Sequence, residues 1–442
     1  MSMKLIFYFI FITLISVFTS SGLKKNNDKN IQLNINSNQN DSSDKRKLEE
    51  NEYKPIRIKS IYMSQIEFFS GRPTESKNIE LFKAAFEKVV NIIQKLVDVY
   101  RLTEKITITE QDYTDYLLDD YKNSDYEADL VIFVDGSKDL SDKDFAKLQI
   151  IKKYNVEGSV NKGRPIVGYL NFNLRHRTFY LPQSDDYIDK IYLYEIFHEF
   201  THFLGFEKSI LRSKSKLSTT FSKRVNGRNR QRLIAIGGKM LQTAKNYFGY
   251  QDLVGIEFDT DDTNLEGEEF LHWDKRLMLG DYMTSDMYYP DQVISEITLA
   301  LLEDLGWYQI KYYTGGLMRF GKNKGKEFIE NDCVKQKDEK TISPSFLNEF
   351  CFQEGTDVYG TCSPGRQSRG YCLQKTIYND VPEFFRRTFT LIGWTSNYGS
   401  KNIEYCPVTS ETILEETYKY YIGNCNIGNS NYGDEIEPTK LA

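Results

Sequence analysis

Apolar residues recur at helical spacing early in the chain, and this pattern predicts a long amphipathic helix over residues 78–102. Two continuous apolar runs follow, at residues 130–134 and 166–172, and each is typical of a buried strand. A polar, loop-like segment separates the two runs.

A second helix is predicted from Ser184 or Asp185, where a short polar residue can cap its first turn, to Leu204. Gly205 follows, and a glycine lets a helix stop in a left-handed turn. Helix, strand, strand and helix together predict an α+β fold in which this second helix packs on a twisted sheet.

Two further helical patterns lie downstream. Residues 232–247 show helical spacing within a basic stretch, residues 210–258, that we interpret as part of an insertion folded onto the core. Residues 293–305 are strongly apolar and end at Gly306. A buried core helix explains that second pattern better than the alternative, a membrane-binding helix.

The N-terminus has the order of a secretory signal peptide over residues 1–21: a short basic start, an apolar run and small residues. An uncleaved signal anchor is the alternative. Residues 22–55 are polar, so we predict a disordered, pro-like segment there. The C-terminal end is polar, so no glycolipid anchor signal is present, although membrane association stays open. We therefore expect a secreted or lumenal protein.

Length and charge limit the choice of function. The 442 residues suffice for two or three domains. A formal net charge of −6 gives no reason to expect a nucleic-acid partner. The oligomeric state is left open by the sequence.

All six cysteines lie late in the chain: Cys333, Cys351, Cys362, Cys372, Cys406 and Cys425. An even number of cysteines behind a signal peptide predicts disulfides, although six cysteines allow fifteen pairings. We therefore predict a small Cys-rich C-terminal domain over residues 331–442, after a catalytic region over residues 56–330.

The second helix carries the strongest chemical signal, the sequence His-Glu-Phe-Thr-His at residues 198–202. Residues i and i+4 share one helix face, so His198 and His202 can offer two imidazoles to one zinc ion while Glu199 projects beside them. Zinc makes a water acidic, and a neighbouring carboxylate can take its proton. The alternative is an amphipathic helix with two incidental histidines.

A catalytic zinc keeps three protein ligands, so the pair needs a third. His272, next to Trp273, is the natural candidate, although a lone histidine beside a tryptophan is more often a satisfied structural residue. His176 lies between two arginines, and we do not expect it to be a ligand.

With both segments in view, the chain resembles the leishmanolysin family of metzincin zinc endopeptidases. Metzincins share H-E-x-x-H-x-x-G-x-x-H followed by a Met-turn. Here the pattern is intact through Gly205, but no histidine follows at the usual distance. Leishmanolysins have a large insertion at this point, which would correspond to residues 206–271. The sequence LHWDKRLMLGDYMT is similar to the family's later block. The resemblance implies a zincin fold, His272 as the third ligand and Met283 as the Met-turn residue.

Two departures from the family concern cysteine. Family catalytic domains usually carry disulfides, but no cysteine precedes Cys333 in this chain. The family's pro-segment also implies latency through a cysteine that blocks the zinc, and no upstream cysteine is available here for that role. The sequence therefore predicts a catalytic region that relies on its hydrophobic core.

The sequence thus predicts a secreted zinc endopeptidase with one zinc per chain and protein or peptide substrates. Glu199 would be the general base, and the substrate would lie extended along an edge strand near residues 168–172. One alternative is a catalytically silent surface or adhesion protein that keeps the fold and binds protein ligands. Another is a structural zinc protein in which Glu199 is idle, although structural sites tend to have four protein ligands.

Overall fold

A computed structural model describes most of the chain between residues 52 and 410. The described residues are 52–63, 73–109, 121, 123–136, 146–173, 185–222, 229–259, 270–285, 292–312, 318–333, 349–350, 361–362, 364–366, 369–373, 376–377, 381, 397–398, 403–406 and 408–410. The predicted signal peptide, nearly all of the predicted pro-like segment and His176 lie outside them. Within these residues, no helix combines the length and the apolarity needed to cross a membrane.

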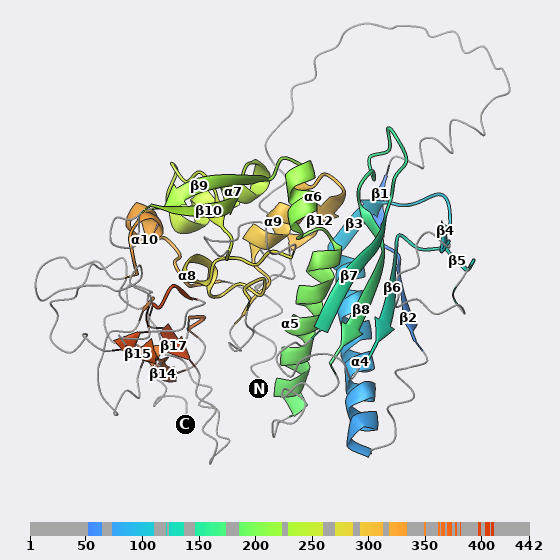
Figure 1. Cartoon of the computed structure of the whole chain (residues 1–442), viewed down its shortest axis with the longest axis horizontal. Coiled ribbons are helices and arrows are strands. Elements are labelled where there is room, and N and C mark those ends of the chain that lie inside the picture. The colour runs from blue at the N-terminus through green and yellow to red at the C-terminus, as the bar shows by residue number, and fades with distance from the viewer. Residues whose placement is uncertain are drawn as a thin grey trace, which may run out of the picture. The chain divides into compact units, whose positions relative to one another are not determined.

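The site is built on a four-stranded sheet with the order β2-β6-β8-β7 (Figure 1). Its strands are β2 (Ile58–Tyr62), β6 (Leu130–Asp135), β8 (Pro165–Phe172) and β7 (Ala146–Lys153). The first three are parallel neighbours, whereas β7 pairs antiparallel with β8. The predicted strands at residues 130–134 and 166–172 are therefore confirmed.

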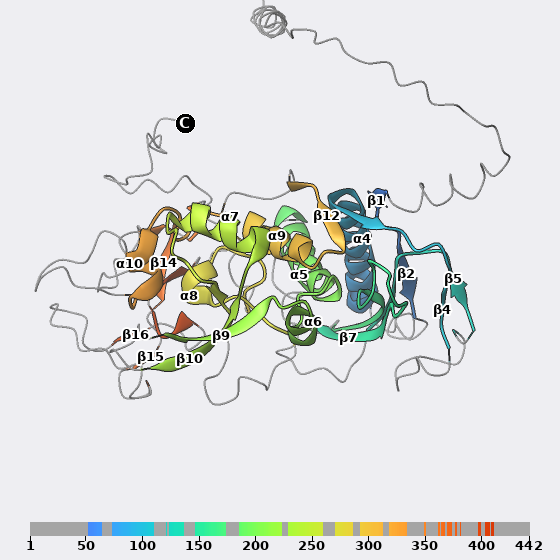
Figure 2. The same cartoon turned by 90° about the horizontal axis from the view of Figure 1, so that it is seen from above.

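The two faces of β6 pack into different hydrophobic clusters, as the period of two along a strand requires. Leu130, Ile132 and Val134 join the large core cluster, whereas Val131 and Phe133 join a smaller cluster on the other face. Helices α4 (Pro73–Leu96) and α5 (Asp185–Phe203) supply residues to the large cluster and pack against each other (Figures 1 and 2). The mixed helix and sheet content confirms the α+β class.

The first helix is shorter at its end than predicted. It ends at Leu96, and Val97–Tyr100 forms strand β3 between β1 (Tyr53–Pro55) and β12 (Tyr308–Ile310). Val97 and Val99 are fully buried there. Valine fits a half-buried pleated surface, and pairing with two distant strands overrides the helical spacing of the apolar residues.

The segment between the predicted strands, which we expected to be a loop, contains strand β7. Every second residue of β7 faces one side, and most of its side chains are only partly buried. A partly exposed edge strand lacks the apolar run that marks a central strand. Strand β7 pairs with the outer side of β8, so β8 lies inside the sheet and β7 forms its edge. The prediction that residues 168–172 form an edge strand is therefore wrong.

Short elements follow α5 in the described residues 206–222 and 229–259. They are α6 (Lys208–Ser213), β9 (Leu217–Ser222), β10 (Arg230–Ala235), α7 (Gly238–Phe248) and β11 (Ile256–Glu257). The helix predicted at residues 232–247 is therefore wrong in its first part, which is strand β10. Gly237, which precedes α7, and Gly238, its first residue, both have positive φ at this boundary.

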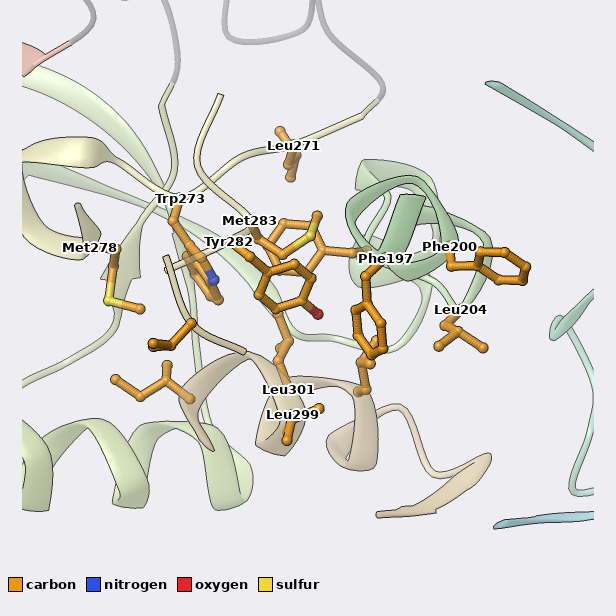
Figure 3. Packing of buried hydrophobic residues seen from close by; sticks show 14 of the residues in the cluster. Phe197, Phe200, Leu204, Leu271, Trp273, Met278, Tyr282, Met283, Leu299 and Leu301 are labelled. Carbon is orange, nitrogen blue, oxygen red and sulfur yellow. The ribbon is translucent and has the colours of Figure 1, made fainter. Parts of the chain in front are cut away.

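The predicted apolar helix at residues 293–305 is α9 (Glu296–Asp304), and it is buried as expected. Ser295 caps it by accepting a hydrogen bond from the Thr298 N–H. Its buried side chains include Leu299 and Leu301, which lie below the segment that carries Trp273 (Figure 3). The remaining helices are α8 (Lys275–Met278) and α10 (Gly325–Glu330).

Short strands complete the description. They are β4 (Ile106–Thr107), β5 (Asp125–Tyr126), β13 (Thr361–Cys362), β14 (Arg369–Leu373), β15 (Thr376–Ile377), β16 (Asn397–Tyr398) and β17 (Val408–Ser410). One disulfide is described, Cys333–Cys406, and both its cysteines belong to the large core cluster. The side chains of the other four cysteines lie outside the described residues. The predicted domain boundaries at residues 56 and 331 and the predicted insertion stay predictions.

Candidate active site

Helix α5 ends where the sequence predicts. Gly205 has φ +118° and its N–H donates to the His202 carbonyl, while the Phe206 N–H donates to the Thr201 carbonyl. This pair of bonds is a Schellman motif, which needs a left-handed residue after the helix. A Cβ at residue 205 would also lie 2.7 Å from Leu305 Cδ1. Glycine is therefore required here for its conformation and for its size.

Three histidines meet at one point. His198 Nε2 lies 3.2 Å from His202 Nε2 and 3.1 Å from His272 Nε2. His198 and His202 are buried, and His272 is partly buried. Two of these side chains come from successive turns of α5, and the third comes from the segment that precedes α8. The structure thus brings together all three predicted ligands.

The other ring nitrogens of the helical pair are held by main-chain oxygens. His198 Nδ1 lies 2.8 Å from the Tyr282 carbonyl, and His202 Nδ1 lies 2.8 Å from the Phe206 carbonyl. A carbonyl only accepts, so Nδ1 carries the hydrogen in both rings and the Nε2 lone pairs face each other. Metal-binding histidines are typically oriented in this way.

Burial keeps the three imidazoles neutral. Desolvation lowers the pKa of His198 to about 4 and that of His202 to about 3, and it lowers the pKa of His272 well below its usual value. The Nε2 atoms of His198 and His202 are both acceptors and cannot donate to each other. The site therefore fits a cation, since a cation would accept all the lone pairs directed at it.

Glu199 follows His198 on α5 and is only partly buried. Desolvation raises the pKa of its carboxyl group to about 7. A cation held by the neighbouring imidazoles would act in the opposite direction, because it favours the charged carboxylate. A carboxyl group with a pKa near neutral pH can both take up and release a proton.

The turn that contains Met283 packs against α5. Tyr282 lies edge-on to Phe197, and its hydroxyl lies 2.8 Å from Thr201 Oγ1 (Figure 3). Met283 is fully buried, and its carbonyl accepts a hydrogen bond from the Trp273 N–H at 2.8 Å. The turn thus connects the helix to the residue next to His272.

Sequence reasoning missed the carboxylate that organises this turn. Asp281 is fully buried and accepts from the Met283 N–H at 2.7 Å and from Thr298 Oγ1 at 2.8 Å. Thr298 Oγ1 in turn accepts from Trp273 Nε1 at 2.7 Å. An aspartate two residues before the methionine was visible in the sequence, but its burial and its partner on α9 were not.

Two clusters of metal-binding residue types occur within the described ranges. One is the histidine triad, and the other comprises Asp332, Cys333 and Cys406. The two sulfurs of the second cluster form a disulfide, so they offer no thiolate to a metal. In this part of the chain, the histidine triad is therefore the candidate metal centre.

A helix with the His-Glu-x-x-His sequence, packed on a mixed sheet and joined by a third histidine from a later turn, is the arrangement of a metallopeptidase. The chain belongs to the leishmanolysin family: the sequence model of this family matches residues 74–434. The predicted resemblance is confirmed.

Several named proteins are similar to the chain. A leishmanolysin-like peptidase of Caenorhabditis elegans is 27% identical over 213 residues, which cover 45% of this chain and 32% of the relative. A leishmanolysin homolog of Crithidia fasciculata is 25% identical over 250 residues, covering 55% and 34%. A human ciliated left-right organizer metallopeptidase is 27% identical over 234 residues, covering 50% and 28%. The matched part of the chain thus spans about a third of each relative.

Proposed function

We propose that this protein is a secreted zinc endopeptidase that hydrolyses internal peptide bonds of proteins. The observation that carries the proposal is the convergence of three Nε2 atoms, with Glu199 directly after His198 in the sequence. Membership of a metallopeptidase family supports it. Secretion rests on the N-terminal pattern of the sequence alone.

His198, His202 and His272 would hold one zinc ion per chain through Nε2. Bound zinc supplies Lewis-acid chemistry, because it polarises a carbonyl oxygen and makes water acidic enough to be a nucleophile near neutral pH. The carbonyls of Tyr282 and Phe206 fix the tautomers of the helical pair, so that both rings offer a lone pair.

Glu199 moves the proton. Its carboxylate takes a proton from the attacking water and passes it to the leaving amine nitrogen as the peptide bond breaks. Met283 is not a ligand in this proposal: it forms a polarisable apolar floor below the histidines. The buried position of Met283 in the core supports that role.

The substrate would lie along β7, the edge of the sheet, and not along β8. Among the described strands only β8 pairs with β7, so the outer side of β7 can pair with an extended peptide. Such pairing uses the main-chain groups of the peptide.

The test is hydrolysis of casein by the full-length chain, with and without a zinc chelator. Chelator-sensitive cleavage is expected, and Glu199→Ala should abolish it while bound zinc, measured by elemental analysis, stays at one per chain. Glu87→Ala is the matched control, since Glu87 is an exposed glutamate on another helix, α4. Zinc binding without cleavage would favour the catalytically silent adhesion protein instead, and absence of zinc would refute the assignment of the three histidines.

A further inference from the structure

His272 depends on contacts that the helical pair does not need. It precedes α8 and belongs to no helix or strand, so no local repeat fixes its position. Its carbonyl accepts from the Asp259 N–H at 2.8 Å. Asp274, two residues later, caps α8 by accepting from the Arg276 N–H at 2.8 Å. The position of His272 therefore follows that of Asp274 and its partners.

A buried ionic cluster surrounds Asp274. The Arg232 guanidinium, on β10, donates to Glu257 at 3.0 Å and also donates to Asp274. The side chains of Arg232 and Asp274 are only 1% and 3% exposed. A buried charge has lost its hydration, so removing its partner would leave it uncompensated and would destabilise the fold. The members of this cluster therefore depend on one another for their positions.

The third carboxylate of this cluster comes from the far end of the sequence. Glu404 lies 3.7 Å from Arg232 and accepts a hydrogen bond from Arg230 at 2.5 Å. Its side chain is 6% exposed. Glu404, a residue of the predicted Cys-rich region, thus completes the buried ionic cluster that contains Asp274.

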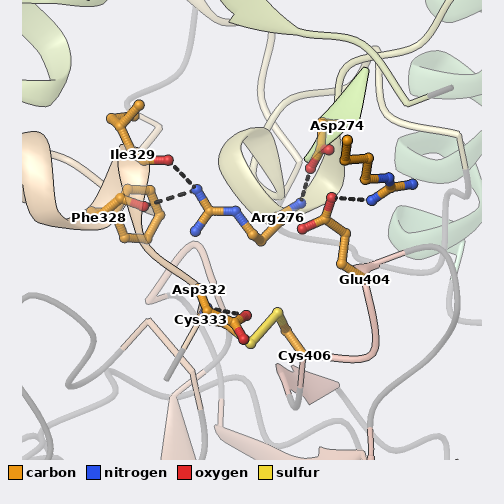
Figure 4. The surroundings of a disulfide bond; sticks show 9 residues. Asp274, Arg276, Phe328, Ile329, Asp332, Cys333, Glu404 and Cys406 are labelled. Atoms are coloured by element: carbon orange, nitrogen blue, oxygen red, sulfur yellow. Dashed lines mark hydrogen bonds and ion pairs between the residues drawn. A yellow bond between two sulfur atoms is a disulfide. The ribbon is translucent and has the colours of Figure 1, made fainter. Parts of the chain in front are cut away.

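A disulfide lies close in sequence to Glu404 and joins its segment to the end of α10 (Figure 4). Cys406 lies two residues after Glu404, and its partner Cys333 follows α10. The Arg276 guanidinium donates to the carbonyls of Phe328 and Ile329 on α10, at 2.8 and 3.0 Å. The Cys333 side of the disulfide therefore contacts the segment that follows His272 directly, whereas the Cys406 side reaches it through Glu404 and Arg232.

The backbone at Glu404 is also unusual. Glu404 has φ +51° and Tyr405 has φ +59°, so two consecutive residues other than glycine are left-handed. Such conformations persist only where the surroundings impose them. The disulfide at Cys406 and the arginines opposite Glu404 supply those surroundings.

We propose that Glu404 is a positioning residue for His272, and that the Cys333–Cys406 disulfide holds Glu404 in place. The inference rests on the proposed metal site. It assigns to the C-terminal part of the chain a role in metal binding, which it performs without contacting the metal.

The test measures the zinc dissociation constant by competition with a chromophoric chelator, in the absence of substrate. Glu404→Gln and the double variant Cys333→Ser/Cys406→Ser should each weaken zinc binding by about 10-fold or more, the range found when outer-shell partners of metal ligands are removed. The visible spectrum of the Co²⁺-substituted protein should change in both variants.

Asp129→Asn is the matched control. Asp129 is a fully buried carboxylate that pairs with Arg57. It also accepts a hydrogen bond from the N–H of Leu102, a residue of the smaller cluster on the other face of the sheet. The Asp129→Asn variant should have a lower melting temperature than the wild type, while its zinc affinity should stay within about two-fold of the wild-type value. If Glu404→Gln does not fold, Glu404→Asp keeps the charge on a shorter side chain and is judged by the same criterion.

The inference is overturned if folded Glu404 variants bind zinc as the wild type does, or if Asp129→Asn weakens zinc binding equally. Its failure differs from failure of the proposed function. Wild-type protein that binds zinc but cleaves nothing refutes the endopeptidase alone, whereas unchanged affinity in an active Glu404 variant refutes the positioning role alone. Wild-type protein without zinc affinity refutes both.

Discussion

Helix α5 and the segment at residues 271–284 bring histidines to the same point by different physical means. In α5, the spacing of His198 and His202 places both on one face as soon as the helix forms. In the later segment, His272 is held through Asp274, Trp273 and residues distant in sequence. A local repeat thus fixes two ligands, and a network of buried polar groups fixes the third. Variants of the two regions should therefore fail in different ways.

The largest effect is expected from Glu199→Gln, which keeps the shape of α5 and removes the proton acceptor. Loss of a general base typically costs 10²- to 10⁴-fold in rate, so kcat should fall by about 10³-fold. The zinc content should be unchanged, because Nε2 of each histidine is untouched. Steady-state kinetics with a quenched fluorescent peptide would check this, and a fall of less than about ten-fold would contradict the assigned role.

Gly205→Ala changes the left-handed residue that ends helix α5. Alanine would be strained at φ +118°, and its Cβ would meet Leu305, so the free energy of unfolding should fall by about 3 kcal/mol. Because the Phe206 carbonyl orients His202, zinc affinity should fall too. Urea denaturation and chelator competition measure the two effects. Unchanged stability would show that the left-handed turn is not needed.

Thr298→Val removes the polar contacts that α9 makes with the segment at residues 271–284. The variant keeps the shape of the side chain but removes the acceptor for Trp273 Nε1 and a donor to Asp281. Leaving these buried groups unsatisfied should cost about 2 kcal/mol. The comparison predicts that the variant loses amide protection around His272 and keeps it in α5. Amide hydrogen exchange can measure the two regions separately. Equal loss of protection in both regions would contradict it.

The last effect concerns pH. Burial raises the pKa of Asp281 to about 6 from an ordinary value of 3.8, so the native state binds more protons than the unfolded state between these values. The contribution of Asp281 to stability should therefore fall, by about 2 to 3 kcal/mol, as pH rises from about 4 to 7.

Asp281→Asn provides the reference for this titration. The difference in unfolding free energy between the wild type and the variant should shift against the wild type as pH rises, measured by urea denaturation at pH 4.5, 6 and 7.5. A difference that is constant with pH, or that shifts in favour of the wild type, would contradict the raised pKa.

The elements that sequence pattern predicted well are those whose pattern is local. The strand at residues 130–134 is apolar throughout because both its faces are covered, and α5 ends at a glycine that its left-handed turn requires. Strands β3 and β7 were missed, because one continues a helical pattern and the other is a partly exposed edge. Only pairing with other strands decides both.

The same division applies to the site. The sequence by itself determined that His198, Glu199 and His202 share a helix, since their spacing needs nothing but α-helical geometry. The need for a third ligand made His272 a candidate, which the resemblance to a family strengthened, whereas Met283 was recognised only through that resemblance. Tertiary structure alone decided that Asp281 lies buried against α9 and that Glu404 reaches Arg232, because burial and pairing between separate segments leave no periodic signal in the sequence.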